Sequence, residues 1–569
     1  MADHREPGDS PDQQHTPRPT PHVPHPPTRV SRRSTLRTAG GALGALVSAP
    51  LLAAAPPARG AAVSGTAPRD DASGYEEPCP APGSGTPPKR QMRAAWIASV
   101  VNIDWPSARG LDVATQKAEL TRLYDEAVSH RLNAVFVQIR PTADAFWHSP
   151  FEPWSEWLTG TQGVDPGYDP LDFAITEAHK RNLEFHGWFN PYRVSMHNDI
   201  RRLVASHPAR RHPDWVFEYG GRFYYDPGIP RVRAFVQDAM LHAVQHYDMD
   251  GVHFDDYFYP YPVSGQRVPD QATYARYGGR FERIEDWRRH NIDLLVREMG
   301  ERIKAAKPHV RFGISPFGIW RNRSSHPEGS DTSGFESFDG IFADSRKWVL
   351  EGWLDYINPQ VYWEIGLKVA DYAKLVPWWA GVAGRTRTHL YIGQAAYKVG
   401  NPGAWQDMRE LSRHLAFNRD YPQVDGDVYF SAIRLRTTAA EAMRIVVEDH
   451  YQRPALVPVT EGLGGAAPPA PLITDARRTE RGAEVAVRPR HRSDTTYFAV
   501  YRLPGAADST APPTCDIEDA RHLAGTVRSD GEPATFVDTE VAGGPHTYYA
   551  TALDRMHHES EPSRGRSIR

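Results

Sequence analysis

The strongest constraint on the fold is a repeated alternation of short apolar runs and longer amphipathic segments, which begins at Met92. Eight runs rich in apolar, β-branched and aromatic residues predict strands at residues 92–98, 134–139, 184–189, 251–254, 310–315, 356–361, 390–395 and 428–432. Amphipathic segments between them predict helices, among them residues 116–131, 170–181, 231–247, 283–304 and 404–417. Because parallel strands need such helical crossovers, eight of these units predict an α/β fold of the (β/α)8 TIM-barrel type.

An open, doubly wound sheet is the alternative fold with the same alternation. That fold often carries a glycine-rich phosphate turn after an early strand, and the sequence contains neither G-x-G-x-x-G nor a P-loop. The closed barrel is therefore favoured, with large loops near residues 141–169, 190–230, 257–282 and 317–345.

Composition divides the rest of the chain into an export region, two linkers and a second domain. Arg32-Arg33 precedes a modest apolar run at residues 39–55 and then small residues, which is the order of a twin-arginine signal; a chance arginine pair is the alternative. Short alternating runs at residues 484–487, 497–501, 535–537 and 546–552 are typical of a small β-sandwich. We predict a signal region with a disordered N-terminal extension at 1–62, a Pro/Gly-rich linker at 63–90, the barrel at 91–455, a linker at 456–471, and a fibronectin type III-like sandwich at 472–569.

This organisation predicts a secreted or envelope-associated protein. The apolar run is too short to remain as a stable membrane anchor after signal cleavage. The 66 Lys+Arg and 70 Asp+Glu residues nearly balance, so we expect no nucleic-acid partner. Cys79 and Cys515 are the only cysteines; an oxidising compartment would allow them to pair, but the sequence specifies neither this disulfide nor the oligomeric state.

Functional residues of a TIM barrel lie at the C-terminal ends of its strands, and here the sequence places polar and aromatic side chains. Sugars present hydroxyl groups at their rims and C–H groups on their faces, so both kinds of side chain suit a glycan. All 15 Trp residues lie between Trp96 and Trp405, inside the predicted barrel. The candidate substrate-binding residues are Trp96, Asp104, Arg140, Asp144, Trp188, Asn190, Tyr192, Arg193, Tyr257, Trp320, Gln360, Tyr362 and Trp363.

Carboxylates are the candidate catalytic groups. The sequence has no HExxH motif, three-His cluster, G-x-S-x-G elbow or dinucleotide fingerprint, so we expect neither a metal nor a cofactor. Glycoside hydrolysis needs a carboxylic acid and a second carboxylate. Asp255 or Asp256, at the end of the fourth strand, is predicted as nucleophile or stabiliser, and Glu364, after the sixth strand, as acid/base. The alternatives are an aspartate pair that caps the next helix and an ordinary loop carboxylate at Glu364.

Neighbouring strand residues point in opposite directions, so we expect one aspartate to face the cleft and the other to contact Arg140 or Arg193. His253 is expected to form hydrogen bonds inside the barrel. The family 18 chitinase signature D-G-x-D-x-D-x-E matches at Asp250, Gly251 and Asp255, but His253 and Tyr257 replace its other acids. This difference argues against that mechanism as such, while substrate-assisted catalysis with Asp255 and Asp256 stays open.

Several segments together resemble the glycosyl-hydrolase-like family 10 proteins. They include Val137-Gln-Ile-Arg-Pro141, Phe185-His-Gly-Trp-Phe-Asn-Pro-Tyr192, Asp250-Gly-Val-His-Phe-Asp-Asp-Tyr257 and Pro359-Gln-Val-Tyr-Trp363. The resemblance extends from about residue 92 to about 434 and implies a TIM barrel and a bacterial envelope glycosidase that cuts peptidoglycan strands lacking stem peptides. An α-glucan or other polysaccharide hydrolase, and a non-catalytic carbohydrate-binding envelope protein, are the alternatives.

Overall fold

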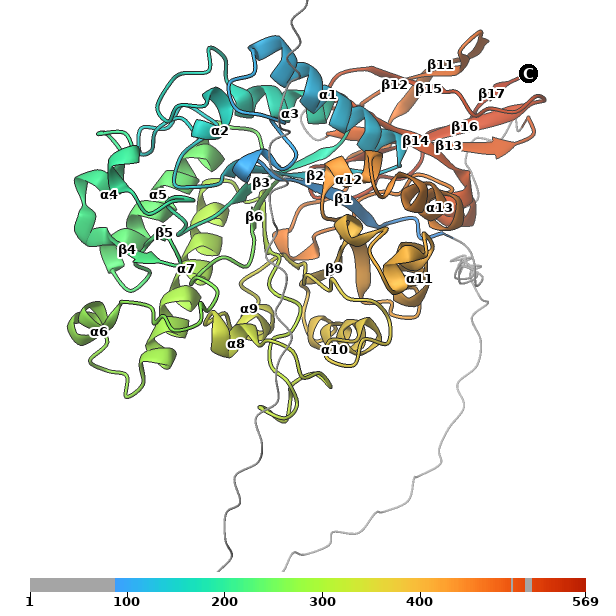
Figure 1. Ribbon diagram of the computed structural model, residues 1–569. Coiled ribbons are helices and arrows are strands. Elements are labelled where there is room, and N and C mark those ends of the chain that lie inside the picture. Colours follow the sequence, from blue (N-terminus) through green and yellow to red (C-terminus); the bar gives the residue numbers. More distant parts are fainter. Residues whose placement is uncertain (1–86, 493–494, 507–513) are drawn as a thin grey trace, which may run out of the picture. The chain divides into compact units, whose positions relative to one another are not determined.

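Figure 1 shows a computed structural model of the protein, in which residues 87–492, 495–506 and 514–569 are described. The predicted signal region and nearly all of the first linker lie outside these residues, so both stay predictions. Within the described ranges, no helix combines the length and the apolar character that crossing a membrane requires.

Eight parallel strands close into one barrel, which confirms the predicted TIM-barrel fold and excludes the open sheet. Strand β10 pairs with β1 to close the barrel, with Gly426 opposite Met92. The barrel strands are β1 (Met92–Ile97), β2 (Ala134–Arg140), β3 (Glu184–Phe189), β6 (Gly251–Phe254), β7 (Arg311–Ile314), β8 (Tyr356–Ile357), β9 (His389–Gln394) and β10 (Val424–Tyr429).

Helices surround the barrel on its outside (Figure 1). The longer ones are α1 (Val113–Ser129), α3 (Pro170–Lys180), α5 (Pro230–His246), α7 (Ile284–Ala306), α10 (Tyr372–Ala383), α11 (Glu410–Asn418) and α13 (Ala440–His450). Local signals fix some of their ends: Asp112 accepts a hydrogen bond from the Thr115 amide at the start of α1, and Asp169 caps α3, where Pro170 is the first helical residue.

The loops after the strands contain their own short elements. These are α2 (Glu156–Thr159), α4 (Pro208–Arg211), the hairpin β4 (Val216–Tyr219) and β5 (Arg222–Tyr225), α6 (Gln271–Tyr277), α8 (Ser337–Gly340), α9 (Ser345–Leu350) and α12 (Ala432–Arg436). Most of them lie in the four long loops expected from the sequence, at the end of the barrel where the strands finish.

The eighth strand differs most from its predicted bounds, because it begins at Val424 instead of residue 428. It contains Asp425 and Asp427, of which the barrel buries Asp427: it accepts hydrogen bonds from Gln394 Nε2 and Asn418 Nδ2, both at 2.8 Å. Glycine is needed at residue 426, since a Cβ atom there would lie 2.2 Å from the Met92 carbonyl oxygen. A stretch that contains two aspartates and a glycine has no apolar pattern to reveal it.

The barrel interior contains a chain of hydrogen-bonded polar side chains. His253 is fully buried, as expected; its Nε2 accepts from Trp96 Nε1 at 3.0 Å, and its Nδ1 lies 3.2 Å from the Tyr356 hydroxyl. The same hydroxyl lies 3.0 Å from His186 Nδ1, and His186 Nε2 lies 3.3 Å from Glu184 Oε2. Because burial lowers the pKa of both histidines, the two rings are neutral.

The C-terminal region forms two antiparallel sheets. One contains β11 (Leu472–Thr479), β12 (Gly482–Arg488) and β15 (Ala534–Asp538); the other contains β13 (Tyr497–Pro504), β14 (Leu523–Arg528), β16 (His546–Leu553) and β17 (Arg566–Ile568). Residues of both sheets share one hydrophobic cluster, and the assignment to the fibronectin type III type stays a prediction. Cys515, in α14 (Thr514–Glu518), is disulfide-bonded, whereas Cys79 lies outside the described residues.

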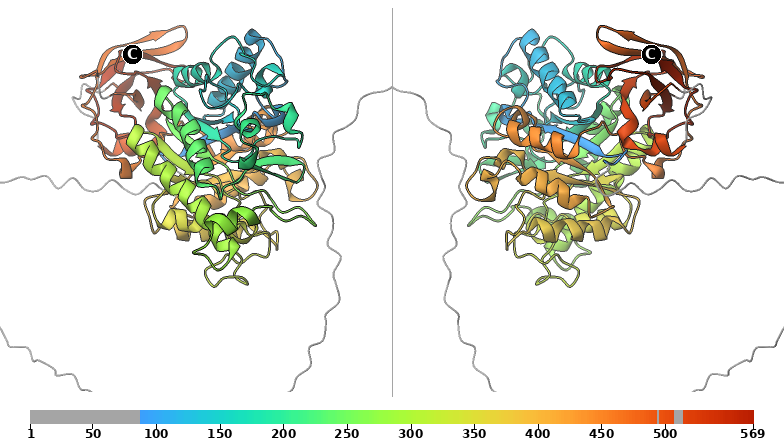
Figure 2. Two further views of the ribbon diagram at one scale, coloured as in Figure 1. Left: turned by 90° about the vertical axis from the view of Figure 1, so that its left-hand side faces the viewer. Right: turned by 90° about the vertical axis from the view of Figure 1, so that its right-hand side faces the viewer.

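The C-terminal sheets pack against the barrel at the end where its strands begin (Figure 2). His557 Nε2 lies 2.6 Å from Oε1 of Glu184, the first residue of β3, and Arg555 reaches Asp250, which directly precedes β6. Asn182, just before β3, donates a hydrogen bond to Thr526 of β14 at 2.8 Å. These contacts lie at the N-terminal ends of the strands, away from the C-terminal ends where the functional residues of TIM barrels lie.

Candidate active site

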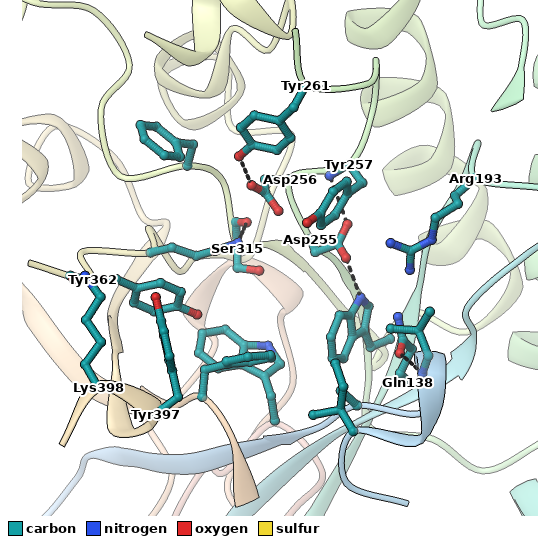
Figure 3. Close-up of a pocket in the computed structure, with 18 of the residues that line it drawn as sticks. Gln138, Arg193, Asp255, Asp256, Tyr257, Tyr261, Ser315, Tyr362, Tyr397 and Lys398 are labelled. Carbon is teal, nitrogen blue, oxygen red and sulfur yellow. Dashed lines mark hydrogen bonds between the residues drawn. The ribbon is translucent and has the colours of Figure 1, made fainter. Parts of the chain in front are cut away.

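A pocket of about 440 Å³ lies at the C-terminal ends of the barrel strands (Figure 3). Predicted site residues that line it are Trp96, Trp188, Arg193, Asp255, Asp256, Tyr257, Gln360, Tyr362 and Trp363. They come from strands or loops on all sides of the barrel, so the fold brings together residues that lie far apart in the chain, from Trp96 to Trp363.

Asp255 follows directly after β6 and is held by three N–H donors. Its Oδ2 accepts from Trp188 Nε1 at 3.1 Å and from Asn190 Nδ2 at 2.5 Å, while its Oδ1 accepts from the Tyr257 amide at 3.0 Å. Burial raises the pKa of Asp255, and the Arg193 guanidinium and these donors oppose that rise because they favour the anion. The three hydrogen bonds thus fix the orientation of the Asp255 carboxyl group before any substrate binds.

Asp256 occupies a different electrostatic environment in the same pocket. Its Oδ2 accepts a hydrogen bond from the Tyr261 hydroxyl. Burial and the neighbouring Asp255 charge raise the pKa of Asp256 to about 7. The two adjacent carboxyl groups therefore have unlike environments: that of Asp256 favours the protonated form, and the donors around Asp255 favour the anion. Acid catalysis requires one carboxyl group of each kind.

Both aspartates face the pocket, in contrast to the expectation that only one would. The physical reason is that β6 ends at Phe254, so the strict alternation of side-chain directions no longer applies to the next two residues. Arg193 donates to Asn190 Oδ1 at 2.9 Å, and its charge opposes the rise that burial causes in the Asp255 pKa.

Aromatic side chains form much of the remaining wall. The Trp363 ring lies edge to face against Phe317, with 5.4 Å between ring centroids, and Tyr362 lies edge to face against Tyr397 at 5.8 Å. The indole N–H of Trp96 donates a hydrogen bond to His253, and that of Trp188 donates to Asp255. These bonds fix the positions of both rings. Such rings suit the apolar faces of sugars.

Asn190 and Arg140 support the pocket from behind instead of lining it. Asn190 is fully buried and connects Asp255 to Gln138, whose Nε2 donates to Asn190 Oδ1 at 2.5 Å. Arg140 is fully buried and binds Glu152 through two hydrogen bonds of 2.7 and 2.5 Å. The structure therefore gives both side chains protein partners where sugar hydroxyls were expected.

Three other predicted binding residues lie in the protein interior. Asp104 accepts from the Ala98 amide at 2.7 Å and from Ser431 Oγ at 2.7 Å, which joins the ends of β1 and β10. Asp144 is fully buried, and burial raises its pKa to about 7. The Tyr192 side chain is also fully buried, so none of the three lines the pocket.

Trp320 and Glu364 follow strands as predicted, but their side chains turn away from the pocket. Trp320 stacks on Trp378, with 6.0 Å between ring centroids, and its Nε1 donates to Asp344 at 2.8 Å. Glu364 Oε2 accepts from Trp405 Nε1 at 3.0 Å. Neither side chain lines the pocket as predicted, because both contact residues of the surrounding loops and helices. The position of a residue after a strand does not reveal such contacts.

The pocket also contains residues that the sequence analysis did not select. They include Gln138, Tyr261, Ser315, Phe317, Tyr397, Lys398 and Phe430. Most of them lie at or just after the end of a strand, so the same positional signal could have identified them. In the described part of the chain, no group of three or more His, Cys, Asp or Glu side chains could hold a metal ion.

Comparison with known proteins shows the family to which the chain belongs. The family profile described as "Glycosyl hydrolase-like 10" matches residues 91–409. Glycosyl hydrolase YngK of Bacillus subtilis (strain 168) is 47% identical over 485 residues, which cover 84% of this chain and 93% of the relative. Glycosyl hydrolase DigH of Escherichia coli (strain K12) is 41% identical over 363 residues, which cover 60% of this chain and 82% of the relative.

Among solved structures, the glycoside hydrolase domain of PgaB (BpsB) from Bordetella bronchiseptica matches with a TM-score of 0.43 and 13% identity, over 62% of this chain and 98% of that domain. The family profile and the long relatives confirm the resemblance seen in the sequence. The chain therefore belongs to the glycosyl hydrolase-like 10 family and is a glycoside hydrolase.

Proposed function

We propose that the protein hydrolyses an N-acetylated bacterial cell-wall glycan, namely peptidoglycan strands without stem peptides. The observation that carries the proposal is the pair Asp255 and Asp256, buried side by side in a pocket with aromatic walls. Membership of the glycosyl hydrolase-like 10 family supports the reaction class.

Asp256 acts as the general acid. Its pKa of about 7 leaves it protonated in a useful fraction of molecules at neutral pH, so it can give its proton to the glycosidic oxygen as the bond to the anomeric carbon breaks. The resulting Asp256 carboxylate then takes a proton from water, and the hydroxide part of that water forms the new bond to the anomeric carbon. After the two steps Asp256 is protonated again, and one water molecule has been consumed.

Asp255 stabilises the positive charge that develops on the sugar. Three N–H donors and Arg193 favour its anionic form, and they fix the direction of its oxygens. With an N-acetyl sugar, Asp255 would accept a hydrogen bond from the acetamido N–H while the acetamido oxygen displaces the glycosidic oxygen from the anomeric carbon. The water of the second step then displaces the acetamido oxygen and restores the acetamido group. The adjacency of the two aspartates supports this route over one in which Asp255 itself attacks.

The predicted twin-arginine signal supports export, and hence a substrate in the cell envelope. We also assign the C-terminal sheets to a fibronectin type III-like sandwich, because seven antiparallel strands among the described residues, in sheets of three and four, share one core.

Activity on defined glycans tests the proposal. Asp255→Asn and Asp256→Asn should each lower kcat on peptide-free glycan strands by about 1000-fold or more, with unchanged circular dichroism. Glu364→Gln, outside the pocket, should lower it less than about tenfold. A thiazoline analogue of N-acetylglucosamine should inhibit if the acetamido group takes part. Cleavage of α-glucan but not of wall glycan, or full activity of both aspartate variants, would contradict the proposal.

A further inference from the structure

The pocket has two cationic side chains, and they differ in what they bind. Arg193 donates from Nε to the Pro141 carbonyl oxygen at 3.0 Å and from Nη2 to Asn190 Oδ1 at 2.9 Å, and its charge acts on Asp255. Its guanidinium therefore helps to hold Asn190 and to stabilise the Asp255 carboxylate. Figure 3 shows Lys398 on the other side of the pocket, away from Arg193.

Lys398 has no comparable acidic partner. It ends the short helix η4 (Ala396–Lys398) after β9, and its Nζ donates to the Tyr362 carbonyl oxygen at 2.6 Å. Glu364 is close enough to influence the Lys398 pKa, but it accepts its hydrogen bond from Trp405 Nε1. Within the described ranges no carboxylate lies within ion-pair distance of Lys398, so two of its three N–H donors have no protein acceptor.

The two remaining donors of this pocket-lining ammonium are available to a bound ligand, and an anion there would accept a charge-assisted hydrogen bond that is stronger than one to a neutral sugar hydroxyl. We propose that Lys398 forms an anion subsite that binds a free carboxylate carried by a sugar of the glycan in the pocket. The inference rests on the proposed function, and it adds a residue that determines which glycan is preferred.

The chemistry of wall glycan makes such a subsite selective. The lactyl carboxyl group of a muramic acid unit is a free anion when the stem peptide is absent and an uncharged amide when the peptide is attached. Lys398 would therefore favour peptide-free strands by charge as well as by size. A uronic acid in another polysaccharide offers the same carboxylate, so this second source needs its own test.

Three substrate pairs separate these cases. The first compares peptide-free peptidoglycan strands with the same strands after carbodiimide coupling to ammonia, which converts each carboxylate to an uncharged amide. The second compares uronic-acid oligosaccharides with their amides. The third measures, by calorimetry, binding of N-acetylmuramic acid against its amide, which gives a readout that does not depend on turnover.

The variants are Lys398→Met, which removes the charge at similar length, and Lys398→Arg, which keeps it. Lys368→Met is the matched control, because Lys368 is exposed on the loop after β8 and does not line the pocket. For the unmodified enzyme, kcat/KM should be about 10- to 100-fold higher on free strands than on amidated strands, the range of a charge-assisted hydrogen bond. In Lys398→Met this ratio should fall to about 1, while Lys398→Arg and Lys368→Met should keep most of it.

The possible outcomes separate this inference from the proposed function. If the unmodified enzyme cleaves wall strands but treats free and amidated strands alike, the Lys398 subsite is refuted and the proposed function stands. If it cleaves uronic-acid glycans instead, with the same dependence on Lys398, the subsite stands and the proposed substrate is wrong. If Lys398→Met binds N-acetylmuramic acid as tightly as the unmodified enzyme, the inference is overturned whatever the enzyme cleaves. Melting temperatures within about 2 °C of the parent would show that the variants are folded.

Discussion

Replacement of Asp256 by asparagine should make the protein more stable at alkaline pH while it removes activity. The folded protein raises the Asp256 pKa from 3.8 to about 7, so it binds this proton more tightly than the unfolded chain does. Between about pH 4 and pH 7 the unfolded chain loses the proton first, and the contribution of Asp256 to stability falls as the pH rises. Above about pH 7 the folded protein must hold a buried charge beside Asp255.

The size of this effect follows from the two pKa values. The difference between 3.8 and about 7, at roughly 1.4 kcal/mol per pH unit, gives an upper limit of about 4 kcal/mol. An asparagine side chain cannot ionise, so the variant escapes this cost. The variant should therefore gain stability over the parent as the pH rises, by about 2 to 4 kcal/mol between pH 5 and pH 8. For a barrel of this size that gain corresponds to roughly 3 to 5 °C in Tm.

Thermal unfolding followed by circular dichroism, at about pH 5, 6, 7 and 8, measures the gain as the Tm of the variant minus that of the parent. The subtraction removes the effect of other buried acids, such as Asp144 and Asp427, which titrate in both proteins. Asp214→Asn, an exposed change outside the pocket, serves as the control and should give a difference independent of pH. A Tm difference for Asp256→Asn that stays constant from pH 5 to pH 8 would refute the raised pKa and the acid role built on it.

Two further predictions follow from contacts around the barrel. Tyr261→Phe removes the hydroxyl that favours the ionised form of Asp256, so the pKa of Asp256 should rise. In a pH profile of kcat/KM, the fall in activity on the alkaline side should then move to higher pH by about 1 unit. If that fall does not move, another group controls it. His557→Ala leaves the buried Glu184 with one hydrogen bond fewer, so urea unfolding should show a loss of about 2 to 3 kcal/mol, and equal stability would mean that water replaces the imidazole without cost.

The barrel was predictable because its strands carry a strong apolar signal and its helices an amphipathic one. Strand β3 was predicted with its observed bounds, since Glu184 and Phe189 mark sharp changes of pattern. Strand β10 was predicted too late in the chain, at 428–432, because Asp425 and Asp427 look like loop residues, although the barrel buries Asp427. Strand β8 was extended in the prediction, although it ends at Ile357 just before Asn358 and Pro359.

Site residues on or directly after strands could be predicted from the order of the strands. The direction of side chains in the longer loops could not. Asp255, Asp256 and Trp188 lie on or immediately after strands, so topology alone brings them together. Trp320 lies in the loop beyond β7, where the chain has no regular period, and its partners Asp344 and Trp378 come from elements that the sequence did not predict. Direction in such loops is set by tertiary packing, which one sequence does not reveal.

Asp255 and Asp256 are consecutive residues, and this has a consequence for how the enzyme can change. Their separation is set by one peptide unit at the end of β6 instead of by the packing of two distant elements. Loops that carry Trp363 or Lys398 can therefore be remodelled to accept other glycans without altering the distance between the two reacting groups. A change of substrate preference in these loops would therefore leave the spacing of the two carboxyl groups as it is.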